Sequence, residues 1–313
     1  MKKMLSVLTA GLMAVSLFVA CDDGGTPNTG SKPSGSSGDN RYGGMSGLVE
    51  KSSVKVPYNA ARNWTAELAE ETSEWAVVGV EDLQKISELV NAGTYNFGGD
   101  TILLLNDIVI NKKVINDDYT EPVEAAPGVP TEGLVNLDSI GMRDKPFCGD
   151  FDGQGHIIWG YYSYQAHQGL GFFGAISNAV VKNLILVDSC VINMNTGGGD
   201  DSDDDRFGGL VGMVVEPAGS EIENCVFVGV VGSDLALKRG DPYEYIGGLV
   251  GRCDAAATAT NCFVLAKVYG DADVVCKKGA ENLTKTDVDG YALDASSDFA
   301  ALEEAIEYIK SIL

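Results

Sequence analysis

The sequence predicts an all-β solenoid, because a two-part pattern recurs three times in the middle of the chain. The first part is a short segment bounded by glycines, and the second is an asparagine followed by an apolar run. One copy has two short β-prone segments and cannot bury them alone, whereas stacked copies build a continuous core. We therefore expect equivalent positions to lie one above the other, about 4.8 Å apart.

The three copies keep nearly the same spacing, with glycine-bounded segments that start 38 and then 39 residues apart. The copies are Gly171–Gly174 with Asn183, Gly209–Gly212 with Asn224, and Gly248–Gly251 with Asn261. Glycines beside a strand allow tight corners where a Cβ would clash. An asparagine at a corner tolerates the left-handed conformation, and stacked asparagine side chains can hydrogen-bond along the stack.

Helical patterns flank the repeats. Residues Glu81–Gly93 form an amphipathic pattern that opens with acids and can end at the glycine, and a strand pattern follows over Thr101–Ile110. A second amphipathic helix is predicted over Phe299–Ile312, with Phe299, Leu302, Ala305, Ile306 and Ile309 on one side. We expect it to cap the open strand edge of the solenoid, ahead of docking a partner. Residues 48–74 have no assignment.

The first residues predict export and lipid anchoring. Lys2 and Lys3 precede the uncharged apolar run Leu5–Ala20, which is too short to span a membrane and ends before Cys21. The stretch around this cysteine resembles the lipobox of bacterial lipoproteins, which implies cleavage before Cys21 and acylation of its thiol. An ordinary secretory signal with an incidental cysteine is the alternative. The domains are thus a signal peptide (1–20), a Gly/Ser-rich flexible linker (21–47) and a β-helix domain (48–313).

The charge limits the classes of partner. The whole chain carries a net charge of −23, and the predicted leader contains two lysines and no acid. A surface this negative argues against binding nucleic acid or anionic lipid headgroups. It is compatible with cationic partners, with Ca²⁺ or with solubility alone. The membrane partner that we expect is therefore reached through the lipid anchor, in the cell envelope, at the outer membrane or cell surface.

The repeat pattern resembles the GLUG repeat of bacterial surface and secreted proteins. The copies lie near residues 169–192, 207–231 and 246–270, and the upstream segment FCGDFDGQGHII at Phe147–Ile158 is similar to the segment that precedes such repeats. The resemblance covers roughly residues 75–270. It implies a right-handed parallel β-helix with an N-terminal helical cap, and it implies no single activity.

Few residues in the sequence are suited to catalysis. Asp152 and His156 of the FDGQGH segment could pair as acid and base in a polysaccharide enzyme, but we favour a tight turn built on the glycines. The chain has two histidines, and none of the common nucleophile, zinc-protease or P-loop spacings occurs. Carboxylate-only glycosidase chemistry stays open among 45 acids. Three tyrosines (Tyr161, Tyr162 and Tyr164) are either a sugar-stacking patch or packing of the first repeat.

The six cysteines after the anchor contain no CxxC pair, which argues against a zinc site. Cys225 and Cys262 occupy equivalent repeat positions, and in-register neighbours lie about 4.8 Å apart, farther than the roughly 3.8 Å between the Cβ atoms of a disulfide. We therefore expect stacked, buried free thiols that act as small apolar residues. The sequence leaves open how the other four pair: Cys148, Cys190, Cys253 and Cys276.

The best candidate for a ligand site is the acidic insertion Gly197–Asp205, which lies between two repeats. The next repeat has its own insertion, Ser233–Tyr245, at the same place, and such insertions project from one edge or face of a solenoid. Asp201, Asp203 and Asp205 start like a calcium loop. Arg206 stands where that loop needs glycine and Gly212 where it needs glutamate, so a solvated acidic loop is favoured and a Ca²⁺ site is the alternative.

These features favour a non-catalytic cell-envelope lipoprotein whose one-sided loops bind a protein or glycan ligand of a host, a matrix or a partner cell. A polysaccharide-acting enzyme with carboxylates in a groove is the second hypothesis. A structural component of the envelope is the third.

Overall fold

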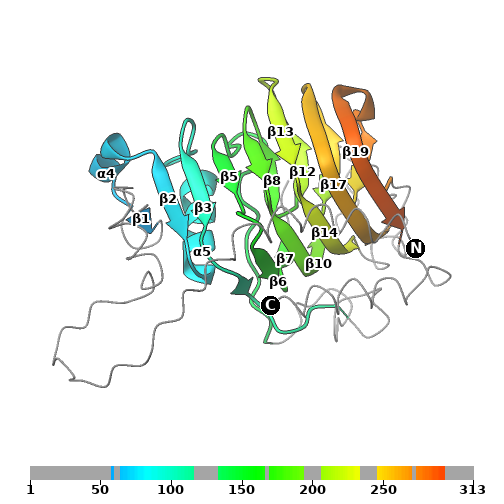
Figure 1. Cartoon of the computed structure of the whole chain (residues 1–313), viewed down its shortest axis with the longest axis horizontal. Helices are drawn as coiled ribbons and strands as arrows, with labels where there is room; N and C mark the ends of the chain where they lie inside the picture. Colours follow the sequence, from blue (N-terminus) through cyan, green and yellow to red (C-terminus); the bar gives the residue numbers. More distant parts are fainter. Residues whose placement is uncertain are drawn as a thin grey trace, which may run out of the picture. The chain divides into compact units, whose positions relative to one another are not determined.

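The computed structural model describes residues 58–59, 64–115, 133–165, 169–193, 206–232, 245–269 and 273–292, all of which belong to one unit, Tyr58–Leu313. About half of these residues lie in strands, the strands pair in parallel, and strands of successive repeats lie side by side (Figure 1). The mainly parallel β-structure that the sequence predicted is therefore confirmed. In the described residues no helix is long and apolar enough to cross a membrane.

Each repeat contributes strands to three layers. The first layer holds β2 (Glu74–Val77), β3 (Thr101–Leu104), β5 (Asp150–Asp152), β9 (Val180–Lys182) and β13 (Ser220–Glu223). The second layer holds β4 (Ile108–Val109), β6 (Ile157–Trp159), β10 (Ile185–Asn193) and β14 (Val226–Val231). The third layer holds β8 (Phe173–Ile176), β12 (Val211–Val214), β16 (Val250–Cys253) and β18 (Cys276–Lys278).

The first two layers are joined through long strands. β17 (Ala257–Val268) pairs with β13 through its first half and with β14 through its second half, and it turns between them at Asn261. β19 (Leu283–Ala292) pairs along both halves of β17 and is the last strand in the described residues. Four shorter strands complete the pairing: β1 (Tyr58–Asn59), β7 (Tyr162–Gln165), β11 (Arg206–Gly208) and β15 (Tyr245–Gly247).

Each repeat contains one strand more than the sequence predicted. We predicted a glycine-bounded strand, a turn, an asparagine and a second strand, but a first-layer strand also precedes each asparagine: β9, β13 or the first half of β17. In β13 the burial alternates, with Ser220 and Ile222 inside and Glu221 and Glu223 exposed. This alternation over four residues is a genuine strand signal, but it is too short and too polar to stand out in the sequence.

The glycines of the repeat allow neighbouring backbones to approach closely. A Cβ on Gly212 would lie 2.6 Å from both Gly174 O and Leu170 N in the preceding repeat, and one on Gly171 would lie 2.8 Å from Gly212 N. Real Cβ atoms do not come this close to backbone, so only glycine fits at these stacked positions.

The predicted elements upstream of the repeats are confirmed in part. Helix α5 (Val80–Ala92) ends at Gly93, whose φ of 72° is the left-handed conformation expected of the closing glycine. The strand predicted over Thr101–Ile110 is broken into β3 and β4. The stretch without an assignment contains β1 and the helix α4 (Ala66–Glu71), whose first turn is capped by Thr65. The C-terminal helix predicted over 299–312 lies outside the described residues.

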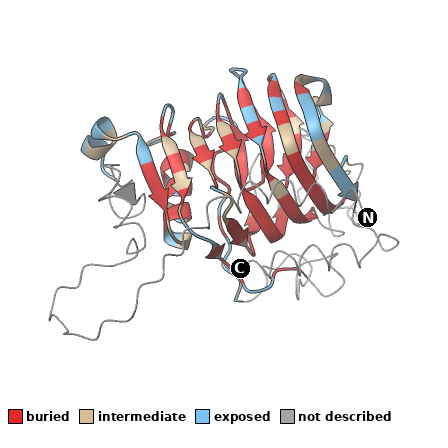
Figure 2. Cartoon of the chain, viewed as in Figure 1, coloured by how far each residue is buried: buried red, intermediate tan, exposed pale blue. Residues whose placement is uncertain are grey.

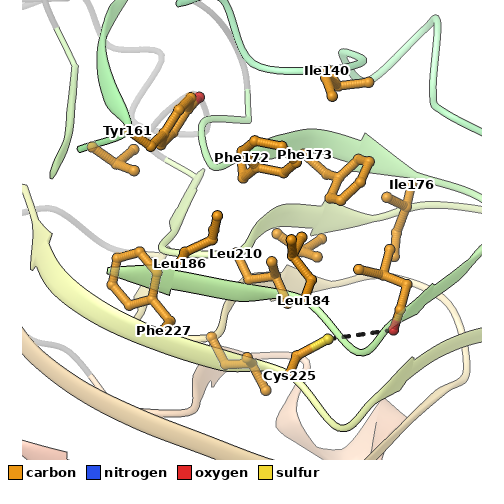
Figure 3. Close-up of a cluster of buried hydrophobic side chains, with 14 of the residues drawn as sticks. Ile140, Tyr161, Phe172, Phe173, Ile176, Leu184, Leu186, Leu210, Cys225 and Phe227 are labelled. Atoms are coloured by element: carbon orange, nitrogen blue, oxygen red, sulfur yellow. Dashed lines mark hydrogen bonds between the residues drawn. The ribbon is translucent and has the colours of Figure 1, made fainter. Parts of the chain in front are cut away.

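The core lies between the layers, and buried residues occupy strands of the sheets throughout the described structure (Figure 2). Figure 3 shows its centre, where Phe172 and Phe173 of the third-layer side meet Leu184, Leu186 and Phe227 from the second-layer side. All five side chains are buried. This core is built from equivalent positions of successive repeats, as stacking requires.

The last strand differs from those before it. Its first-layer half continues a buried inward column that runs through Val181, Ile222 and Ala259, yet the position opposite Ala259 is Lys285, which is exposed. A charged residue that points inward on an edge strand disfavours pairing with a further strand. The end of the sheet is thus protected by its own sequence.

Candidate functional site

The described structure does not include the predicted site residues themselves. Asp201, Asp203 and Asp205 of the acidic insertion lie outside the described residues, and so does the predicted lipid-attachment residue Cys21. The strands from which the acidic insertion leaves and to which it returns are described, so the points at which it joins the sheets are known.

Two insertions share one edge of the sheets. The first follows β10 and the second follows β14, and these strands pair in parallel register with Val191 opposite Val231. The chain resumes in β11 and β15, which also pair in register, with Arg206 opposite Tyr245. Segments 194–205 and 233–244 therefore start from adjacent strands and return to adjacent strands, about 4.8 Å apart. We call these two segments with their flanking strand ends the loop edge.

The second feature is a ladder of side chains at the corner between the first and second layers. Asn183, Asn224 and Asn261 have φ values of 54°, 52° and 50°. Asn224 Nδ2 donates to Asn183 Oδ1 at 3.1 Å, and Asn261 Nδ2 donates to Asn224 Oδ1 at 2.7 Å. The predicted corner asparagines and their hydrogen bonds along the stack are confirmed.

The ladder begins in the FDGQGH segment. Asn183 Nδ2 donates to Asp152 Oδ1 at 2.9 Å, and the same oxygen accepts from Gln154 N at 2.9 Å. Lys182 Nζ lies 3.8 Å from Asp152 Oδ2. Gln154 and Gly155 both have positive φ, and His156 N closes the turn by donating to Gly153 O at 2.8 Å. The segment is the tight turn that we favoured, and Asp152 is the first acceptor of the ladder.

Asp152 and His156 are not brought together as a pair. His156 Nδ1 instead lies 3.1 Å from Asp107 Oδ1, an oxygen that also accepts from Ile157 N at 2.8 Å. Asp107 lies in the break between β3 and β4, and it was not among the residues predicted from the sequence. Burial alone would raise the pKa of Asp107, but the hydrogen bonds from His156 and Ile157 outweigh it, and the pKa lies below its ordinary value.

Replacing Asp107 with Asn is expected to lower the free energy of unfolding by about 1 kcal/mol at pH 7, allowing for solvent screening at this half-exposed site. A carboxylate with a depressed folded pKa stabilises the native state above its unfolded pKa of about 3.9, and this contribution disappears as the pH falls through the folded value. The difference between the two proteins should therefore vanish in acid. Denaturant unfolding across pH 2–8 measures it, with the exposed Asp144→Asn as the control. An unchanged difference at low pH would contradict the assignment.

The three tyrosines after the turn do not form a sugar-stacking patch. Tyr161, Tyr162 and Tyr164 are all buried, and the Tyr161 hydroxyl donates to Gly171 O at 2.7 Å. The alternative that we had left open, packing of the first repeat, is therefore correct.

The predicted free thiols are confirmed. Cys225 and Cys262 are fully buried and unbridged, and Cys225 Sγ donates to Val181 O at 3.5 Å (Figure 3). Burial raises the pKa of the Cys225 thiol well above its ordinary value, so the group stays protonated and behaves as a small apolar residue. The other four cysteines after the anchor are also free, and Cys148 is the one that is partly exposed. Among the residues that the structure describes, no group of three His, Cys, Asp or Glu side chains is arranged to bind a metal.

Comparison with known proteins adds little to this geometry. No protein-family model matches the sequence, and no curated protein matches it. One solved structure, that of a putative immunoglobulin A1 protease from Bacteroides ovatus, is similar with a TM-score of 0.34 and 14% sequence identity, covering 69% of this chain and 74% of that chain. A likeness of this size gives no information about activity.

Proposed function

We propose that this chain is a non-catalytic, lipid-anchored cell-envelope protein that binds a protein or glycan component of a host, a matrix or a partner cell through the loop edge. The observation that carries the proposal is the in-register pairing on both sides of the two insertions. Because the two insertions are attached to adjacent strands, we expect them to contact one ligand together. Loops held by a rigid scaffold are the usual place for recognition.

We also propose the finer architecture, a right-handed parallel β-helix with α5 as part of an N-terminal cap. The stacked layers, the corner ladder and the glycine contacts between repeats support it. Cleavage before Cys21, acylation of its thiol and a location at the outer membrane or cell surface belong to the same proposal. They rest on the leader sequence and on the linker of residues 21–47, whose composition suits a tether.

The test is to replace residues 194–205 and 233–244, separately and together, with short Gly-Ser turns. Binding of the soluble chain lacking its leader to immobilised matrix proteins and to a glycan array is then measured. We expect the double replacement to lose at least tenfold in affinity for any ligand of the parent, with an unchanged melting temperature. The control is Thr258→Ala plus Thr284→Ala on the exposed first-layer face, which should bind as the parent does. Equal binding by all variants would remove the loop edge as the recognition site.

Calcium is the specific cofactor to test, because the five closely spaced aspartates between residues 200 and 205 repel one another and a hard cation would relieve that repulsion. If the insertion is a cation site, calorimetry should show saturable Ca²⁺ binding. The melting temperature should rise with Ca²⁺, and both effects should be lost when Asp201, Asp203 and Asp205 are replaced by Asn. If no heat and no shift appear, the insertion is a solvated acidic loop and the binding proposal stands on shape and charge alone.

The second candidate function is that of a polysaccharide-acting enzyme. Its specific support is the outer face of the first layer, where Asp150 and Asp152 of β5 and Glu221 and Glu223 of β13 flank β9 with its Lys182. Release of reducing sugar from a polysaccharide panel, abolished by Glu223→Gln, would favour the enzyme over the binding protein.

A further inference from the structure

The outer face of the second layer is apolar, whereas a sheet face that is in contact with water carries polar residues. Side chains on a strand alternate between faces. Leu186, Phe227 and Val264 belong to the inner core, so their neighbours along β10, β14 and β17 point outward. These outward positions form two groups. The first is an in-register column of Ile157, Ile185, Val226 and Phe263. The second column consists of the pairs Trp159–Val187 and Val228–Leu265, and the pairing of β10 with β14 is irregular between these two pairs.

The middle of this face is buried. Val187 has 0% of its surface exposed, Val228 has 2% and Leu265 has 5%, yet none of the three belongs to the core between the layers. At the two ends of the same column Val109 is 56% exposed and Tyr291 38%. Figure 2 shows the buried second-layer strands β10 and β14. The pattern is that of a sheet face covered at its centre by a segment of limited width.

We propose that the chain's own C-terminal segment, residues 299–312, docks on this apolar face as an amphipathic helix. One side of that segment carries the apolar residues Phe299, Leu302, Ala305, Ile306 and Ile309, which can pack against the apolar side chains of the face. The opposite side carries Glu304, Glu307 and Ser311, which suit contact with water.

The dimensions agree with this placement. A helix over 299–312 would be about 20 Å long. The covered strands β6, β10, β14 and β17 are successive neighbours, so the face is about 14 Å across, measured perpendicular to the strands. The helix starts close by, because β19 ends at Ala292 beside β17. The six-residue link 293–298 can span about 20 Å when extended.

One other segment of the chain and one other docking site are less suitable. The insertion 194–205 is dominated by acidic and small residues, which have no affinity for valine and leucine side chains. The open edge of the last strand, where the helix was expected from the sequence, is a poorer site. Thr284, Lys285 and Thr286 there are all exposed, and they offer no apolar surface for a stripe of isoleucines.

The test joins helix and face by a disulfide in the full chain, with Cys21→Ala and Cys148→Ser to remove accessible thiols. Val228→Cys is combined with Ile306→Cys in one protein and with Ser311→Cys, on the opposite side of the predicted helix, in the other. After air oxidation, peptide mass spectrometry should find an intramolecular bond in the first protein and at least tenfold less in the second. Equal yields in both proteins would overturn the proposal. A bond only between molecules would show instead that a second copy covers the face.

A second measurement does not depend on engineered cysteines. The chain that ends at Ala292 should bind a dye specific for exposed apolar surface at least several-fold more strongly than the full chain, because the covered face is opened. Ile306→Asp in the full chain should reproduce the increase, and Ser311→Asp should not. No change in dye binding for the folded truncated chain would count against the proposal.

Discussion

Replacing Gly212 with alanine is expected to destabilise the protein by about 3 kcal/mol or more, because the added methyl group has no space between two neighbouring repeats. The added Cβ would lie 2.6 Å from Gly174 O and from Leu170 N. Both contacts are with backbone that is hydrogen-bonded between repeats, since Leu170 N donates to Arg206 O and Gly174 N donates to Ile140 O. Relief therefore requires separating two neighbouring repeats.

The measurement is thermal and denaturant unfolding of the soluble chain, where about 3 kcal/mol corresponds to a melting temperature lower by roughly 6–12 °C. The matched control is Gly79→Ala. Gly79 precedes α5, has an extended φ of −163°, and its added Cβ would meet only the flexible Glu81 side chain. It should cost less than about 1 kcal/mol, at most the loss of a preferred glycine cap. Equal losses at the two sites would mean that contact between repeats does not explain the motif.

Replacing Asn224 with alanine is expected to cost about 3 kcal/mol. Alanine in the left-handed conformation costs roughly 1–2 kcal/mol, and the two ladder hydrogen bonds, to Asn183 and from Asn261, contribute about 1 kcal/mol each. Because Asn224 is the middle member, its loss leaves an unsatisfied amide on both sides.

Two further variants separate the contributions at this corner. Asn224→Gly keeps the backbone conformation without strain and should lose only the hydrogen-bond part, about 2 kcal/mol. Asn261→Ala lies nearer the end of the ladder and removes one ladder hydrogen bond, the one to Asn224, so it should cost less than Asn224→Ala. Unfolding free energies from denaturant titration give all three values. If the glycine variant equals the wild type, the ladder bonds contribute nothing and the backbone alone explains the asparagine.

The sequence predicted the stacking better than it predicted the strands. Three in-phase copies of a glycine and asparagine pattern identified the corners correctly. Asparagine is required there by the local backbone conformation, and glycine by the close approach of neighbouring backbones. The first-layer strands before each corner were missed, since segments such as Ser220–Glu223 are short and half polar. The buried outer face of the second layer was also missed. A strand that is apolar on both faces appears in the sequence as a continuous apolar run. The pattern of Val226–Val231 therefore does not predict that its second face is covered.

The candidate site was predictable only in its position. The insertions were expected at equivalent corners, and the pairing of their flanking strands confirms this. The pairing of His156 with Asp107 joins segments that are 49 residues apart, so no local pattern could reveal it. From the sequence Asp152 had a catalytic interpretation beside the favoured tight turn, because His156 lies close to it in the chain. Its actual partners, Asn183 and Lys182, come from the next repeat.

The inward-facing Lys285 of the last strand has a consequence for how such a chain can change length over evolution. Internal repeats are interchangeable, because each one offers its neighbours the same backbone register and the same corner donor and acceptor. Duplication of a unit such as β12 to β14 would add one more repeat to the stack without altering the contacts of either neighbour. The unit that ends in β19 has no such freedom, since a copy placed inside would bury a lysine. Gene duplication can therefore lengthen the protein only from within, and the terminal unit stays unique.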